Sequence, residues 1–106
     1  MRITQFSKPL KDFNNQPLVI KQENQQIVFF TIKTAILNCL GAKKAISGQE
    51  SIGIYKLGIR LFDIEETQID ANELLLLKIA VEENAPGYTS IIQAQLLLFL
   101  EEVESS

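Results

Sequence analysis

The sequence contains no histidine and no tryptophan, and it has one cysteine and one methionine. Without histidine there is no Ser-His-Asp or Cys-His machinery and no imidazole metal ligand. A single cysteine excludes an intrachain disulfide and any multi-cysteine zinc or iron–sulfur site. No glycine-rich nucleotide-binding loop, zinc-protease motif or calcium-binding loop occurs. We therefore expect no metal, no cofactor and no enzymatic activity.

Long apolar runs are missing as well. The longest covers residues 96–100, far below the ~20 residues of a membrane span. The first nine residues, Met1 to Pro9, lack the apolar segment of a secretory signal. The lone Cys39 lies in an apolar stretch and is typical of a small buried side chain in a reduced compartment. The sequence thus predicts a cytoplasmic protein with no membrane contact.

What is present is ordinary globular composition in a chain of 106 residues, 46% of them hydrophobic and 22% charged. That length and balance predict a single domain over residues 1–106. Residues 1–16, with weak periodicity, are expected to form an extended arm. Residues 17–21 and 26–30 are β-branched and aromatic runs around a polar segment, which predicts a β-hairpin over 17–30.

From residue 31 to 103 the periodicity is helical, and capping residues mark four helices. These are residues 32–40 with Thr31 as N-cap and Gly41 as stop, a helix opened by Ser47 and Glu50 that runs to Phe62 or Asp63, a helix from Asp70 to about Glu83, and a helix from Tyr88 or Thr89 to about Val103. The expected fold class is α+β, mostly α: an N-terminal β-hairpin followed by a compact bundle of about four helices.

The helix opened by Ser47 has one narrow polar stripe that holds Lys56, Arg60 and Asp63. Since most of its remaining surface is apolar, we expect this helix to be central to the fold. Glycine in a helix interior costs roughly 1 kcal/mol relative to alanine. The glycines at 53 and 58 therefore predict the close approach of another backbone.

The last two helices each have a second apolar stripe in addition to a core face. Leu75, Leu76 and Ile79 form one, and Ile91 and Leu98 form the other. One interpretation is that the hairpin and the arm cover these stripes. The other is that they form an interface with a second copy or another protein, because several exposed leucines and isoleucines together are unusual on a monomer.

Charge is divided unevenly along the chain. Through residue 60 there are nine basic and three acidic residues, and from residue 61 there are one basic and ten acidic residues. Such asymmetry indicates electrostatic interaction. Three explanations are open: neutralisation within one fold, head-to-tail association of copies, or nucleic-acid contact through Lys43, Lys44, Lys56 and Arg60. Nucleic acid is the weaker partner class, because the isoelectric point is about 4.9 and dedicated binding domains usually exceed 9.

Several segments, in order, resemble a group of small proteins encoded by tailed bacteriophages and prophages. They are Lys11-Asp12-Phe13-Asn14, Gln16-Pro17, Thr31 to Leu37, Tyr55-Lys56-Leu57-Gly58-Ile59, Asp70-Ala71-Asn72-Glu73 and Ile91-Ile92-Gln93-Ala94-Gln95. The resemblance covers about residues 10–102. It implies a phage or prophage origin and a role in the cytoplasm of a bacterial host, and it assigns no activity and no functional residue.

The sequence therefore predicts a non-enzymatic protein-interaction module of phage or prophage origin. Its partners would be a second copy, as in a homo-oligomer, or a phage or host protein, bound through the apolar helix stripes. The alternative is a small regulator that contacts nucleic acid or the transcription machinery through the basic residues.

Overall fold

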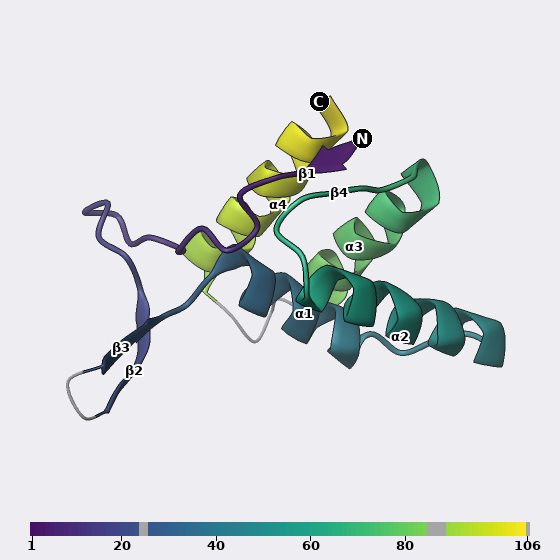
Figure 1. Ribbon diagram of the computed structural model, residues 1–106, viewed down its shortest axis with the longest axis horizontal. Coiled ribbons are helices and arrows are strands. Elements are labelled where there is room, and N and C mark those ends of the chain that lie inside the picture. The colour runs from purple at the N-terminus through teal and green to yellow at the C-terminus, as the bar shows by residue number, and fades with distance from the viewer. Residues whose placement is uncertain (24–25, 85–88, 106) are drawn as a thin grey trace.

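The computed structural model describes residues 1–23, 26–84 and 89–105, which are mostly helical (Figure 1). In chain order the elements are β1 (Arg2–Ile3), β2 (Val19–Glu23), β3 (Gln26–Phe29), α1 (Ile32–Ala42), α2 (Gly48–Phe62), β4 (Thr67–Gln68), α3 (Ala71–Asn84) and α4 (Ser90–Ser105). The predicted class is confirmed: a short antiparallel hairpin precedes four helices. Tyr88, one of the two expected starts of the last helix, lies outside the described residues.

Helix α1 begins where the sequence predicts and ends later. The Thr31 hydroxyl accepts a hydrogen bond from the Thr34 backbone N–H and caps the first turn. The expected stop at Gly41 is wrong, because Gly41 lies within the helix, which ends at Ala42 and is followed by Lys43 as its C-cap. There the backbone turns to an extended conformation, and the Lys43 N–H donates to the Leu40 carbonyl. The glycine is exposed and helical, so it extends the last turn instead of reversing the chain.

The N-caps predicted at Ser47 and Asp70 are both present, but the expected return bond from Glu50 to the Ser47 backbone is not among the hydrogen bonds of the described residues. Ser47 accepts a hydrogen bond from the Glu50 backbone N–H at 3.1 Å. Asp70 and Glu73 form the full reciprocal pair, in which each side chain accepts from the other residue's backbone N–H. These bonds satisfy donors that the first turn of a helix leaves open, and so they fix where α2 and α3 begin.

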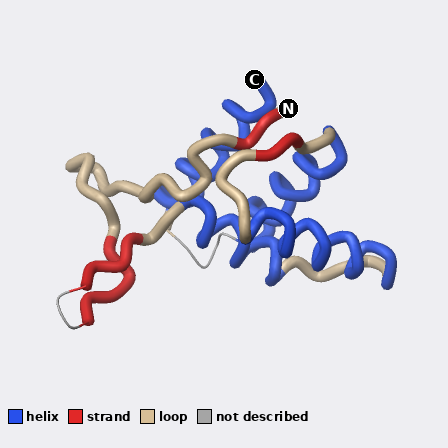
Figure 2. The backbone as a smooth tube through the Cα atoms, in the orientation of Figure 1, coloured by secondary structure: helices blue, strands red, loops and turns tan. Residues whose placement is uncertain are grey.

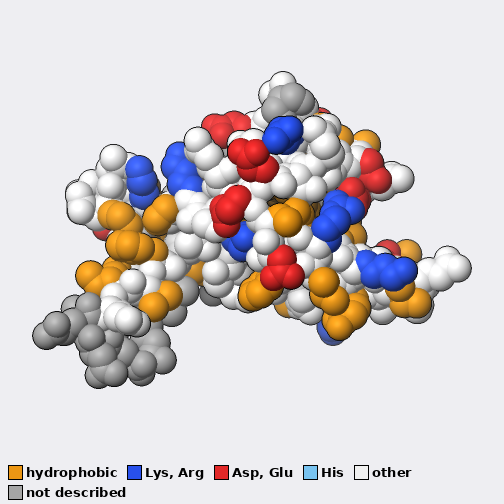
Figure 3. Space-filling model, viewed as in Figure 1, with side chains coloured by type: hydrophobic (Ala, Val, Ile, Leu, Met, Phe, Trp, Pro, Cys, Tyr) orange, Lys and Arg blue, Asp and Glu red, His pale blue; other side chains and the backbone are white. Residues whose placement is uncertain are grey.

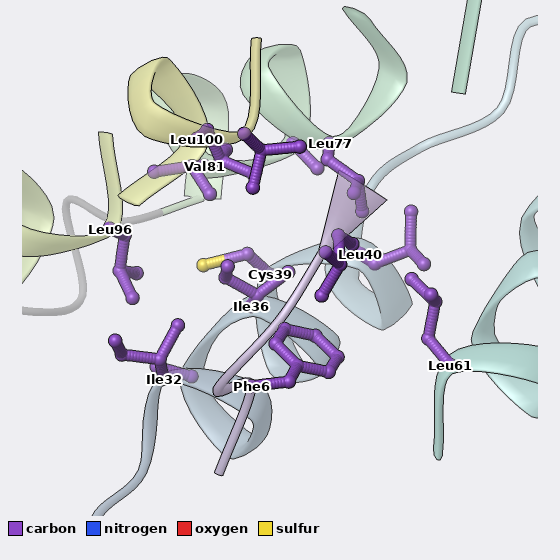
Figure 4. Packing of buried hydrophobic residues seen from close by; sticks show 14 of the residues in the cluster. Phe6, Ile32, Ile36, Cys39, Leu40, Leu61, Leu77, Val81, Leu96 and Leu100 are labelled. Atoms are coloured by element: carbon purple, nitrogen blue, oxygen red, sulfur yellow. The ribbon is translucent and has the colours of Figure 1, made fainter. Parts of the chain in front are cut away.

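The core is built around α1, which contacts α2, α3 and α4. Figure 4 shows Ile36, Cys39 and Leu40 of α1 between the side chains of the neighbouring elements. Leu77 and Val81 of α3 are fully buried on one side of this cluster. Helix α1 therefore holds the position that the sequence analysis assigned to the helix opened by Ser47.

Helix α2 is at the edge of the fold, so the expectation that it is central is wrong. Of its 15 residues only Leu57 and Leu61 are buried, and it packs mainly against α1. The expected backbone approach to its glycines is also absent among the described residues. A Cβ built on Gly53 meets nothing within 4 Å, and one on Gly58 meets only the end of the Leu40 side chain at 3.9 Å.

The N-terminal arm is part of the core, although most of it is irregular in structure. Strand β1 pairs antiparallel with β4 (Figure 2), and Ile3, Phe6 and Leu10 are completely or almost completely buried. The Phe6 ring stacks on Phe99 of α4 with centroids 5.9 Å apart. Gln95 of α4 also holds the arm, because its side-chain amide exchanges two hydrogen bonds with the backbone of Lys11.

The hairpin of β2 and β3 projects away from the helices (Figure 1). Its base is fixed by a chain of backbone hydrogen bonds, from Leu18 to Leu10, from Leu10 to Phe30 and from Phe30 to Leu18. All four residues of β3 are exposed. One interpretation of the sequence had expected the hairpin to help cover the helix stripes. The hairpin does not cover them. Within the described ranges no helix has the length and apolar content to cross a bilayer.

Candidate interaction surface

An exposed apolar stripe runs along α2. It consists of Ile52, Tyr55, Ile59 and Phe62, and we call it the α2 face. These residues are spaced by three, four and three positions, which places them on one side of a helix at about 100° per residue. Each is at least half exposed, and Tyr55 and Phe62 reach 69% and 67%. Figure 3 shows hydrophobic side chains gathered over the part of the molecule that contains α2.

The α2 face adjoins a shallow apolar groove between α1 and α2. The groove has a volume of about 470 Å³. Its α1 wall is formed by Leu37, Leu40 and Gly41, and its α2 wall includes Ile54 and Gly58 together with members of the α2 face. Because both Gly41 and Gly58 lack a side chain here, the groove stays open between the helices. The α2 face and the groove thus form one continuous apolar surface.

Two lysines hold α2 in place against the rest of the molecule. Near its C-terminal end, Lys33 of α1 donates to the Phe62 carbonyl at 3.1 Å and pairs with Glu65 at 3.1 Å. Near its N-terminal end, the Lys43 ammonium lies 3.3 Å from the Glu50 carboxylate. Since both ends are fixed, the α2 face is presented in one orientation.

The Glu65 carboxylate is a junction between three segments. It accepts hydrogen bonds from the Ser7 hydroxyl and backbone N–H of the arm, and it pairs with Lys33 of α1. The hydrogen bond from Ser7, followed by that from Lys33, lowers the pKa of Glu65 below its ordinary value. The connector that follows α2 is therefore tied to the arm and to α1 through one charged group.

The stripes predicted on the last two helices are only partly exposed. Leu76 and Ile91 are half-buried and pack against the core, and Ile79 is half-buried. Leu75 of α3 and Leu98 of α4 are exposed, at 55% and 58%. The interface predicted from these five residues stays a prediction, and it rests on fewer exposed side chains than the α2 face.

The predicted basic group is not a free cationic patch. Lys43 has only 8% of its side chain exposed and lies near Glu50 and Glu83. Arg60 pairs with Glu73 at 2.8 Å. Lys44 and Lys56 are exposed. Two of the four cations are thus engaged by carboxylates of the same chain, which lowers the positive potential that nucleic acid would meet.

Ion pairs within the chain connect its basic and acidic halves. Arg2 pairs with Glu66, and Lys33, Lys43 and Arg60 of the basic half pair with Glu65, Glu83 and Glu73 of the acidic half. A further pair, between Lys78 and Glu104, lies within the acidic half. This arrangement supports neutralisation within one fold as the explanation of the charge asymmetry.

Side chains that could act as a nucleophile or together hold a metal ion are few in the described part of the chain. Cys39 is buried in α1, and desolvation raises the pKa of its thiol, which disfavours the reactive thiolate. Among residues 1–23, 26–84 and 89–105, no three histidine, cysteine, aspartate or glutamate side chains are grouped to hold a metal ion.

The hairpin carries a second exposed apolar surface, which the sequence analysis did not identify. Val19 of β2 and Ile27, Val28 and Phe29 of β3 are all exposed, and Phe13 of the preceding loop is 94% exposed. A run with apolar residues on both faces is typical of a strand that is covered on both sides. The signal was present in the sequence at residues 27–30.

The α2 face was missed as a site for a different reason. Its apolar spacing was visible in the sequence, but apolar residues also line the opposite side of the same helix. Periodicity alone does not say which of two apolar sides meets the core. We found no match to this chain among protein-family models, curated proteins or solved structures.

Proposed function

We propose that this chain is a non-enzymatic protein-interaction module that binds its partner through the α2 face. The observation that carries the proposal is the stripe of four large apolar side chains, each at least half exposed, beside an open apolar groove. A contiguous exposed apolar patch of this kind is typical of an interaction site, and less typical of a surface without a function. The hydrophobic gain is ~1.5–3 kcal/mol for each such side chain when it passes from full exposure to full burial.

The composition supports a binding role over a catalytic one. The sequence has no histidine, and its only cysteine is buried with a raised pKa. The usual acid–base and nucleophile pairs are therefore missing.

The expected partner of the α2 face is a second copy of the chain, or another protein of the cell in which the chain acts. The phage or prophage origin stays a prediction that rests on the resemblance, and the cytoplasmic location stays a prediction from the sequence.

Nucleic acid is not included in this proposal. Contact with phosphates needs cations that are free to replace counterions. Lys43 is nearly buried beside two glutamates, and Arg60 is paired with Glu73. Only Lys44 and Lys56 of the predicted group remain exposed without a carboxylate partner among the described residues.

The test is site-specific photo-crosslinking in cells that naturally carry the gene. A photoreactive phenylalanine analogue replaces Tyr55 in one variant and the exposed Glu101 of α4 in a matched control. We expect covalent products at position 55, to this chain or to another protein, and none above background at position 101. The proposal fails if position 55 gives no more product than the control.

A further inference from the structure

The size of the α2 face limits what can cover it. Taking roughly 200 Å² for each fully exposed large side chain, its four residues present about 500 Å² of apolar surface. Two identical faces would bury about 1,000 Å² before the groove walls are added, which is the lower bound for a specific interface between proteins. A second copy therefore supplies enough surface on its own.

The spacing of the α2 face is symmetric along the helix. The intervals of three, four and three residues have their midpoint at position 57, and the Leu57 side chain itself points into the core. A two-fold axis at this level would bring the same four residues of an antiparallel helix onto the face. In that arrangement Ile52 meets Phe62 of the partner subunit, and Tyr55 meets the partner's Ile59.

This pairing is complementary in shape only when the helices are antiparallel. Each aromatic ring then packs on an aliphatic side chain. A parallel arrangement would set Tyr55 on Tyr55 and Phe62 on Phe62 and leave the two isoleucines opposite each other. Packing that alternates large and smaller side chains fills space better than rings placed directly opposite. At Gly58, next to the axis, an added Cβ would meet only the end of the Leu40 side chain, at 3.9 Å.

Charges at the edge of the α2 face favour the same orientation. Lys56 and Asp63 are exposed and have no ion-pair partner among the described residues. At about 100° per residue both fall beside Ile52, although Asp63 is the C-cap of α2 and also lines the groove. In an antiparallel pair, like flanks face each other, so Lys56 of one copy lies about 7.5 Å along the axis from Asp63 of the partner subunit. Side chains lean toward the N-terminus of their own helix, which closes this gap from both sides.

From the area, the symmetric spacing and the flanking charges, we propose that a second copy of this chain docks on the α2 face with its own α2 antiparallel, forming a two-fold symmetric homodimer. This inference rests on the proposed function and identifies the partner as the chain itself. The groove between α1 and α2 receives the edge of the partner's stripe. The dimer leaves the hairpin and the exposed leucines of α3 and α4 uncovered.

The first experiment measures association of the purified full chain by sedimentation velocity over a range of concentrations. We expect a monomer–dimer equilibrium with Kd of about 10 µM, as befits a small interface. Ile59→Glu should weaken association at least ~30-fold, as expected for the centre of an interface. Leu75→Glu and Leu98→Glu are matched controls, since these leucines are as exposed as Ile59 but lie on α3 and α4, and both should associate as the wild type does.

Circular dichroism of the wild type and the three variants serves as the folding control. We expect all of them to be folded, because each changed side chain is at least half exposed. A wild-type chain that stays monomeric at millimolar concentration overturns the inference. So does an Ile59→Glu variant that dimerises as tightly as the wild type. If association is instead lost with Val28→Asp on β3, the hairpin is the interface and the α2 dimer is wrong.

The second experiment tests the orientation by disulfide trapping under mild oxidation. The double variant Ile52→Cys/Phe62→Cys should form covalent dimers, because an antiparallel pair places each new thiol opposite the other one. Each single variant should form few, whereas a parallel pair would crosslink both singles. The buried native Cys39 makes the wild type a suitable background control. Efficient crosslinking of the single variants would overturn the antiparallel arrangement.

Failure of this inference can be distinguished from failure of the proposed function. A strictly monomeric purified chain that still crosslinks to another protein from position 55 in cells overturns the homodimer and retains the interaction module. Absence of crosslinks at position 55, together with a monomeric chain, overturns both.

Discussion

Helices α1 and α2 each contain seven apolar residues, and the two sets lie in opposite environments. In α1, five of 11 residues are buried, and in α2 only two of 15 are. The difference comes from the number of neighbours, because α1 contacts three other helices whereas α2 packs mainly against α1. The apolar content of a helix therefore predicts how much of its surface needs to be buried. It does not predict that the same chain buries that surface.

The largest expected difference between the two helices is in the response to loss of one isoleucine side chain. Ile36 of α1 is fully buried, and Ile59 of α2 is half exposed. Ile36→Ala should lower the free energy of unfolding by about 2–5 kcal/mol, because it leaves a cavity in the core. Ile59→Ala should change it by less than about 0.5 kcal/mol in a dilute sample, where association does not contribute.

Urea denaturation of both variants measures this difference. Ile59→Ala should still weaken association in sedimentation, which separates its two effects. Equal losses of stability would mean that α2 is as well covered as α1, and the distinction drawn between the two helices would not hold.

Local features of the fold were predictable from sequence, and the environment of each helix was not. The caps at Thr31, Ser47 and Asp70 act within one turn of their own helices, so their spacing in the sequence is sufficient to locate three helix starts. The end of α1 was placed too early, because a glycine stops a helix only when the chain turns there. Backbone conformation at Gly41 depends on the contacts that follow it.

The role of the arm depends on pairing between distant segments. Strand β1 pairs with β4 across more than 60 residues, and nothing in residues 1–16 encodes that partner locally. Burial of Ile3 and Phe6 follows from this pairing. The candidate site was hidden in a similar way: the apolar residues of the α2 face were visible in the sequence, but packing against α1 decides which side of α2 remains open.

A second comparison uses the helix caps. Asp70 of α3 makes the full reciprocal pair with Glu73, whereas at the start of α2 Glu50 is directed to Lys43 and only the Ser47 half is formed. Asp70→Ala and Ser47→Ala should each lower the free energy of unfolding by about 1 kcal/mol. Asp70→Ala should give the larger loss, since it frees Glu73 as well. Thermal unfolding checks the order, and a larger loss for Ser47→Ala would contradict it.

An opposite, stabilising effect is expected at Gly53, which is exposed but lies outside the α2 face. A Cβ at Gly53 meets no atom within 4 Å, and this glycine lies on the side of α2 away from the α2 face. Gly53→Ala should therefore raise the free energy of unfolding by about 0.5–1 kcal/mol through helix propensity alone. Its Kd for association should equal that of the wild type. Loss of association in Gly53→Ala would show that this side of α2, and not the α2 face, is in contact with a partner.

The smallest effect concerns the junction at Glu65, where the connector after α2 meets the arm and α1. Because the pKa of Glu65 is lowered in the folded chain, its contribution to stability is fully present above the pKa of this group in the unfolded chain. The contribution is lost as the pH falls through the lower pKa of the folded chain. Ser7→Ala removes the main cause of the shift and should raise the pKa of Glu65, so that this loss begins at higher pH. Carboxyl NMR titration measures the change. The control is Ser51→Ala, because Ser51 does not contact Glu65. This variant should leave the titration curve of Glu65 unchanged. An unchanged pKa in Ser7→Ala would assign the shift to Lys33 and the Ser7 backbone N–H, and not to the Ser7 hydroxyl.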